Sequence, residues 1–227
     1  MSDRRVWLAG AVVAGTLLLV AGIMLVQDRD AVPSAGPQPT PSPAIEATST
    51  PAPPDLTWEE AGGVALPVSG THGPRLTQDG LASGWSESEP GAAIAAAHLL
   101  IRTGPTVGPE VFEPTITGQT TGPNVAALKL AVNEQYAELQ TNSTAPAAGA
   151  QLVGYRIGSY GDDAATVDLV LESADLSASD RYLQVTVSLR WMNDDWWLVA
   201  PPNGDWAQVS TPLGSLPDGL QRYEDLG

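Results

Sequence analysis

Histidine is the side chain best suited to acid–base chemistry near neutral pH, and this 227-residue chain has two. His98 lies in the apolar run GAAIAAAHLLIR, where a helical rotation of about 100° per residue puts it on the same face as Ile94 and Ile101. Such an inward-facing histidine could act as a general base if a carboxylate oriented it. Asp168 and Glu172, however, alternate with the apolar residues of their predicted strand and so point outward. We therefore expect His98 to be a hydrogen-bonded core residue rather than a catalytic base.

The second histidine and the acidic pairs do not form a pattern typical of a metal site. His72 lies in a THGP turn, and the chain has no cysteine that could complete a zinc site. The acidic pairs at 162–163 and 194–195, and Asp218, lack the spacing of a calcium loop, so we expect turns and solvated charges there. The chain also lacks a G-x-S-x-G nucleophile elbow and a phosphate-binding glycine loop followed by Lys. We expect no catalytic, cofactor-binding or metal-binding residues, and therefore a protein that is not an enzyme.

The longest apolar segment runs from Val6 to Val26, 21 residues without a charged side chain. As a helix it would span about 30 Å, the thickness of the hydrocarbon core of a bilayer. Arg4 and Arg5 precede it, so the positive-inside rule places residues 1–5 in the cytoplasm and the rest of the chain outside the cell membrane. The alternative is a signal peptide with a weak cleavage site near Ser34–Ala35. The length of the apolar segment, residues 6–26, favours an uncleaved single-pass transmembrane helix.

Small residues recur at helical spacing within this segment. Gly10 and Ala14, and Ala11 and Gly15, each give a small-xxx-small pair, which would let two such helices approach closely in the membrane. We expect the chain to form a homo-oligomer, with these four residues as a candidate contact between membrane helices.

A proline-rich linker and an acidic domain follow the membrane segment. Within the linker over residues 27–56, the stretch over 31–56 holds eight prolines and few large apolar side chains, which predicts an extended, semi-rigid spacer reaching at most about 80 Å. From Thr57 to the end, at residue 227, there are seven basic and 21 acidic residues, within a formal charge of −16 for the whole chain. Such a domain repels phosphate backbones, which excludes direct nucleic-acid binding. Without cysteine, it must be stabilised by its hydrophobic core.

The domain over residues 57–227 begins with helical patterns. The glycine- and proline-rich stretch from Trp58 to about residue 86 predicts an irregular wrap with short extended pieces. Ser88 and Pro90 are typical of a helix start, and the apolar run after them predicts a buried helix that ends before Gly104. Between residues 105 and 122 we expect at most one further helical turn. A second long helix is predicted from about Asn124 to Gln140, with a buried face formed by Val125, Leu128, Val132, Tyr136 and Leu139.

After residue 150 the pattern changes to alternation, which is typical of strands. Four strands are predicted, near 153–157, 165–171, 183–191 and 196–199, and the third alternates most cleanly. Tight-turn signals at 161–163 and 193–195 join neighbouring strands. Two helices followed by a four-stranded antiparallel meander predict an α+β domain with the helices packed on one face of a curved sheet. A β-sandwich is the alternative, but two long helical patterns count against it.

Tryptophans near the end of the chain form a candidate interface. Trp196 and Trp197 are adjacent in a predicted strand, so one must enter the core with Trp191 and the other must point outward. Tryptophans at a surface are frequent hot spots of protein–protein contacts. We therefore regard Trp196, Trp197 and Trp206 as candidate interface residues, with cover by the segment after residue 200 as the alternative.

Three segments together, at 66–75 (LPVSGTHGPR), 84–102 (GWSESEPGAAIAAAHLLIR) and 193–206 (NDDWWLVAPPNGDW), support a family resemblance. The chain resembles an uncharacterised actinobacterial family of membrane proteins encoded in conjugative elements. Its helix–helix–sheet order is also similar to the nuclear-transport-factor-two-like cone fold, which occurs in TcpC-type components of type IV secretion and conjugation machines. The resemblance implies a cone-like outer domain that joins other membrane or secretion-complex proteins.

These observations lead to one principal hypothesis and two alternatives. The principal one is a non-enzymatic, single-pass membrane component of a conjugation or type IV secretion-like complex, whose outer domain mediates protein–protein assembly without a cofactor. The first alternative is a surface-tethered small-molecule-binding protein or enzyme that uses a cone pocket near His98 and Tyr136. The second is an adaptor associated with the cell wall or with division.

Overall fold

The computed structural model of the chain describes residues 56–141, 150–172, 176 and 180–222. No helix within these ranges is long and apolar enough to cross a membrane. The predicted transmembrane helix over 6–26, with Gly10, Ala11, Ala14 and Gly15, lies outside the described residues, as does almost all of the linker over 27–56.

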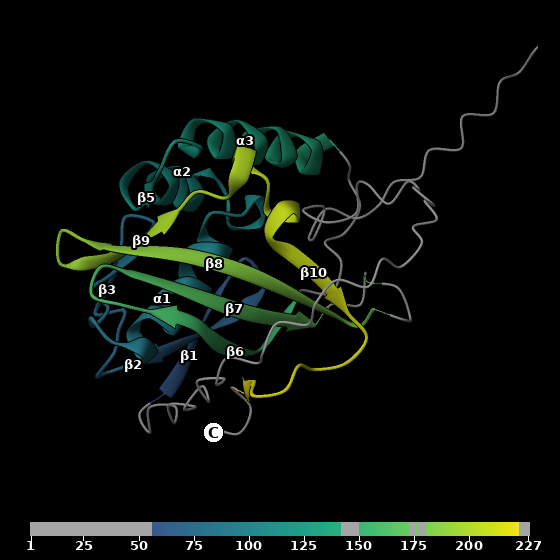
Figure 1. Ribbon diagram of the computed structural model, residues 1–227. Coiled ribbons are helices and arrows are strands. Elements are labelled where there is room, and N and C mark those ends of the chain that lie inside the picture. Colours follow the sequence, from purple (N-terminus) through teal and green to yellow (C-terminus); the bar gives the residue numbers. More distant parts are fainter. Residues whose placement is uncertain (1–55, 142–149, 173–175, 177–179, 223–227) are drawn as a thin grey trace, which may run out of the picture.

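A mixed β-sheet forms the centre of the domain (Figure 1). Its central strands are β6 (Gln151–Tyr160), β7 (Ala164–Glu172), β8 (Tyr182–Met192) and β9 (Asp195–Val199), each antiparallel to the next. This confirms the predicted meander and its position after the helices. The prediction of four strands is incomplete, because β5 (Thr120–Thr121) runs parallel to β9, β10 (Ser210–Leu213) pairs with β8, and β11 (Gln221–Arg222) pairs with β6.

The hairpin between β8 and β9 illustrates how local sequence specifies the meander. Its two loop residues, Asn193 and Asp194, have φ angles of 55° and 58°. Positive φ at both positions is the conformation of a type I′ turn, whose twist matches that of the strands and which Asn and Asp tolerate well. The predicted turn at 193–195 is therefore confirmed, and it brings Trp191 opposite Trp196.

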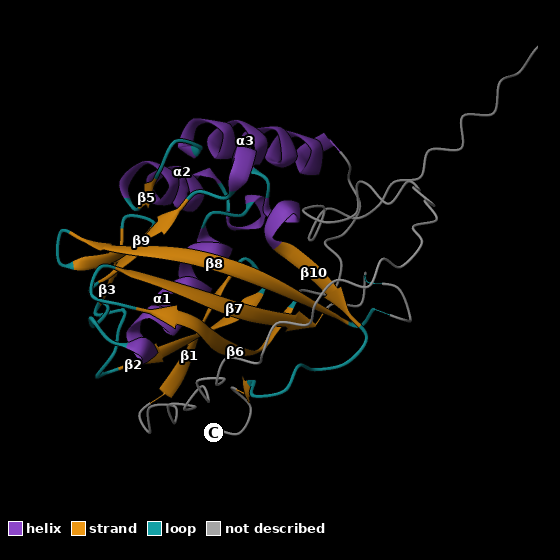
Figure 2. Cartoon of the chain, viewed as in Figure 1, coloured by secondary structure: helices purple, strands orange, loops and turns teal. Residues whose placement is uncertain are grey.

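Three α-helices pack on the sheet (Figure 2). Helix α1 (Glu89–Arg102) begins after Ser88, whose hydroxyl accepts a hydrogen bond from the Gly91 N–H, and contacts β6, β7, β8 and β9. Helix α3 (Val125–Thr141) confirms the second predicted helix. Helix α2 (Pro109–Gly118), preceded by the 3-10 turn η1 (Pro105–Val107), exceeds the single turn expected there, so the prediction of two main helices is incomplete. Helices α2 and α3 lie side by side near β5 and β9 (Figure 2).

The stretch predicted to be an irregular wrap instead forms two β-hairpins. Strands β1 (Leu56–Ala61) and β2 (Val64–Ser69) are joined by a turn at Gly62 and Gly63. Strands β3 (Leu76–Gln78) and β4 (Leu81–Ser83) are joined at Asp79 and Gly80. All four turn residues have positive φ, so these are again hairpin turns of the primed type.

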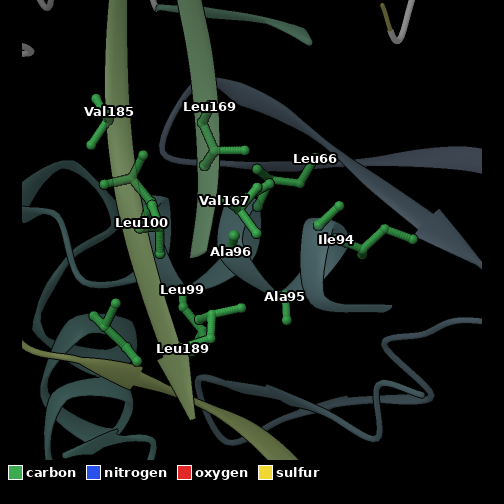
Figure 3. Close-up of a cluster of buried hydrophobic side chains, with 14 of the residues drawn as sticks. Leu66, Ile94, Ala95, Ala96, Leu99, Leu100, Val167, Leu169, Val185 and Leu189 are labelled. Atoms are coloured by element: carbon green, nitrogen blue, oxygen red, sulfur yellow. The ribbon is translucent and has the colours of Figure 1, made fainter. Parts of the chain in front are cut away.

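The hydrophobic core lies between α1, the inner face of the sheet and β2 (Figure 3). Residues 91–100 of α1 are all buried, which agrees with a helix that is apolar nearly all round. Leu66 of β2 lies in the same cluster as Ile94 and Leu99 of α1 and Val167 and Val185 of the sheet, and all five are almost fully buried. The sheet thus covers one side of α1 and the first hairpin covers another.

After β9 the chain passes through two 3-10 turns, η2 (Pro202–Gly204) and η3 (Trp206–Val209), and the first of them packs closely on α3. Gly204 has a φ of 71°, and a Cβ atom there would overlap the backbone of Ala127 and Leu128. Gly219 has a φ of 73°, but a Cβ atom there would meet nothing within 4 Å. The two glycines share a backbone conformation and differ in the space around them.

We predict that Gly204→Ala lowers the free energy of unfolding by about 3 kcal/mol or more, because backbone strain and steric overlap both act there. The matched variant Gly219→Ala should cost only about 1 kcal/mol, the strain alone. Denaturant unfolding of the purified chain measures both values. Equal losses for the two variants would show that α3 and η2 do not approach each other as described.

Candidate functional site

His98 is fully buried, at 0% exposure, and is bonded to the backbone of β2. Its Nε2 atom lies 2.8 Å from the Pro67 carbonyl oxygen. A carbonyl oxygen can only accept, so Nε2 carries the proton and donates. The Nδ1 atom is then the unprotonated acceptor of the ring, and no hydrogen-bond donor reaches it in the part of the chain that the structure describes. Trp85 packs edge-on against the same ring, with a centroid distance of 6.1 Å.

A carboxylate that sequence reasoning missed lies beside this histidine. Glu59 of β1 has its Oε1 atom 3.6 Å from His98 Nδ1 and 2.8 Å from Arg102 Nη2. Arg102 is 5% exposed and also extends Nη1 to within 3.4 Å of the Gly80 carbonyl oxygen. Glu59, His98 and Arg102 therefore form an ionic cluster that links α1 to the first two hairpins. Glu59 went unnoticed because no strand was predicted there, although the turn at Gly62 and Gly63 was a usable hairpin signal.

The electrostatics of the cluster keep His98 neutral. The pKa of His98 is lowered to about 4, mainly by burial and further by the positive charge of Arg102, while the hydrogen bond to Pro67 and the charge of Glu59 partly oppose this shift. At neutral pH both His98 Nδ1 and the Glu59 carboxylate are acceptors, so no proton is available to join them. A general base must also reach its substrate, and this ring has no exposed surface. The geometry is that of a structural cluster.

Tyr136, the other residue predicted to line a pocket, belongs to a different set of contacts. It is partly buried on α3 and packs edge-on against Phe112 of α2, with ring centroids 5.6 Å apart. His98 instead bonds to β2 and lies beside Glu59 of β1. The aromatic pair ties α2 to α3.

A small apolar cavity of about 60 Å³ lies beside the end of α1. Neither His98 nor Tyr136 lines it. Its walls come from the first hairpin, the end of α1, η1, β7, β8, η3, the start of β10 and the residue before β6. The residues that show its mainly apolar character include Ile101, Leu183, Val185 and Trp206, with Ser210 as a polar member. The Ser210 hydroxyl already donates to the Trp206 carbonyl oxygen at 2.7 Å. The cavity could hold a small apolar group, and it is too small for a typical cofactor.

The tryptophans of the candidate interface have different environments. Trp196 is fully buried, donates from Nε1 to the Ser86 carbonyl oxygen at 2.9 Å, and packs against Trp191. Trp206 is 2% exposed and lies in the core. Trp197 is opposite Arg190 on the other face of the sheet and is partly exposed. Of the three, Trp197 is therefore the one that reaches the surface, as the alternation of strand side chains requires.

His72 lies in a turn next to the start of α1. Its Nδ1 atom is 2.8 Å from the Ser86 hydroxyl oxygen and 3.1 Å from that of Ser88. Within the described ranges, no group of three or more His, Asp or Glu side chains is placed to hold a metal ion. These contacts connect the turn to the N-terminal cap of α1.

Over the described residues, the fold and these sites define a single α+β domain with three helices on a mixed sheet, a polar cluster around the buried His98, and a small apolar cavity. A family model for a domain of unknown function (DUF8175) matches residues 26–220, and the chain belongs to this family. No curated protein and no solved structure matches the chain.

We predict that His98 makes the free energy of unfolding depend on pH. The unfolded chain protonates this side chain near 6.5, and the folded chain only near 4, so the unfolded state binds more protons between these values. Stability is therefore retained above pH 6.5 and falls as the pH drops towards 4, by about 3 kcal/mol from this group.

The variant His98→Gln tests this, because its amide can still donate to Pro67 but does not titrate. Denaturant unfolding measured from pH 7 to pH 4 should show a smaller loss in His98→Gln than in the unmodified chain. In the control variant His72→Gln, in which the other histidine is replaced, the loss of stability from pH 7 to pH 4 should equal that of the unmodified chain. Parallel pH profiles for the unmodified chain and His98→Gln would contradict the buried, neutral histidine.

Proposed function

We propose that the protein is a non-enzymatic, single-pass membrane component of a conjugation or type IV secretion-like complex. Its N-terminus is cytoplasmic, and its acidic domain stands outside the membrane as an assembly module for other complex proteins and for further copies of the chain. The support comes from the apolar segment over 6–26, the proline-rich spacer after it, and the resemblance of the segments at 66–75, 84–102 and 193–206 to conjugative-element proteins.

One observation carries the non-enzymatic part of this proposal. The residue best suited to catalysis, His98, is sealed in the core, held neutral, and bonded to a backbone carbonyl. Because the residue best suited to act as a base cannot reach a substrate in solvent, a protein-binding role is favoured over a catalytic one. Large apolar side chains at the surface, such as Trp58 at 42% exposure and Leu130 at 61%, offer anchors for such contacts.

The cone-like fold belongs to the same proposal. Helices that precede an antiparallel meander, with α1 across its inner face, agree with the cone architecture of nuclear-transport-factor-two-like domains. The two N-terminal hairpins are additions to that pattern: the first packs on α1 through β2, and the second contacts α2 through β4.

We predict that deleting the gene abolishes transfer of its element in a mating assay, because an assembly module is needed in stoichiometric amounts. A full-length copy should restore transfer, and so should a His98→Gln copy, since no turnover depends on that residue. A copy whose first thirty residues are replaced by a cleavable secretion signal should fail, because its domain is no longer held at the membrane. Normal transfer after deletion, or rescue by the untethered copy, would refute the proposal.

The apolar cavity favours a second candidate function, the binding of a small neutral molecule. Its walls are mainly aliphatic and aromatic, and the net negative charge of the domain disfavours an anionic ligand there. This function does not need His98 or Tyr136.

We predict that isobutanol, a small neutral probe, shifts the NMR signals of Ile101 and Val185 methyl groups in the full-length chain. Ser210→Leu should abolish the shifts, because the longer side chain fills the cavity. Thr211→Leu is the matched control, since adjacent residues of β10 point to opposite faces. Equal shifts in both variants would exclude the cavity as the binding site.

A further inference from the structure

The turns at 161–163 and 193–194 lie at the same end of the sheet (Figure 1). This end has an aromatic surface built around the buried Trp196. Tyr160, the last residue of β6, is 37% exposed, and its ring centroid lies 6.0 Å from that of Trp196. Trp191, partly exposed, packs edge-on against Trp196 from β8, at 5.1 Å. Trp196 itself is fully buried and supports both rings.

Hydrogen bonds hold three chain segments together at this end. The Trp196 indole donates to the Ser86 carbonyl oxygen at 2.9 Å, which fixes the loop that carries Glu87 beside the aromatic rings. The Trp191 N–H donates to the Asp163 carbonyl oxygen at 2.8 Å, which fixes the turn between β6 and β7. These hydrogen bonds tie together the segments that carry the aromatic rings, which lowers the cost of ordering this surface when a partner binds.

Acidic side chains surround Tyr160. Its pKa is raised from the ordinary value, first by desolvation and then by the negative charges of Glu87, Glu89 and Asp162. The positions of two of these residues agree with this, because Asp162 is two positions after Tyr160 and Glu87 follows Ser86, whose carbonyl oxygen bonds to the Trp196 indole. Arg190, the nearest basic residue along β8, alternates with Trp191 and points to the other face of the sheet. Negative charge beside exposed aromatic rings is the combination that attracts a cationic side chain.

We propose that the surface formed by Tyr160, Trp191, Glu87 and Asp162 docks a Lys/Arg-rich segment of a partner protein. An Arg or Lys side chain lies over the aromatic rings, where it gains a cation–π contact, while the carboxylates pair with neighbouring basic residues. A strongly acidic domain excludes anionic lipids and acidic proteins as occupants. The docking surface deepens the proposed assembly role and rests on it, because it names the chemistry of the assembly partner.

A fluorescein-labelled Arg-rich peptide tests the proposal by fluorescence anisotropy with the full-length chain in nanodiscs of zwitterionic lipid. The double variant Glu87→Gln/Asp162→Asn should weaken binding by about threefold to tenfold. Tyr160→Leu, which keeps an apolar side chain but removes the aromatic ring, should weaken binding by about threefold. The matched control Glu134→Gln/Glu138→Gln, which removes two exposed charges from α3, should change binding by less than about twofold.

Equal weakening by the two double variants would show non-specific charge attraction and would overturn the docking surface, as would absence of peptide binding. The result of the peptide-binding measurement can be distinguished from the result of the mating assay. If deletion abolishes transfer but chains with Glu87→Gln/Asp162→Asn bind the peptide like the unmodified chain, the docking surface fails and the assembly role stands. If the peptide binds as expected and deletion leaves transfer normal, the docking surface stands as a binding site and the conjugation role fails.

Discussion

The burial of α1 is the constraint on which the rest of the domain depends. A helix whose residues 91–100 are all buried cannot be covered by one sheet face alone, because a helix exposes its side chains in every direction. The meander covers one side and β2 covers another, so the first hairpin is part of the core. Every polar group on this helix then needs an internal partner, and the carbonyl of Pro67 supplies one for His98. The same hairpin contributes Glu59, which pairs with Arg102 at the end of the helix.

The helices and strands that were predicted correctly are those whose local sequence pattern is enough to determine their structure. The meander follows from alternation along each strand, and α1 follows from the cap at Ser88 and the apolar run. The short strands β5, β10 and β11 carry too few residues for any period, so tertiary pairing alone determines them. Only one helical turn was expected where α2 forms, and Pro114 inside this helix is one reason for the underestimate. Proline removes one hydrogen bond, and in this helix the contacts with α3 and β4 outweigh that loss.

The surroundings of His98 were harder to predict from the sequence than the fold, and strand β6 illustrates the physical reason. The strand predicted near 153–157 rests on the alternation of Val153, Tyr155 and Ile157, which in a regular strand would lie on one face. A bulge between Leu152 and Gly154 changes the register, so Leu152 and Tyr155 join the core cluster and Val153 does not. The partner of His98 was hidden for a related reason, since Glu59 is 39 positions away in sequence and reaches α1 only through the first hairpin. Spacing along a chain does not reveal contacts that a bulge or a hairpin creates.

Charge and tether act together in the proposed arrangement. The domain over residues 57–227 carries 21 acidic and seven basic residues, and the proline-rich segment before it would reach up to about 80 Å if extended as proposed. Repulsion from an anionic membrane surface would act only close to that surface, because the membrane field is largely screened beyond a Debye length of about 8 Å. It would therefore oppose direct contact between the domain and the membrane. A basic partner bound at the Tyr160 surface would reduce the repulsion locally. Partner binding would therefore change how closely the domain can approach the membrane, which gives the acidic charge a role beyond solubility.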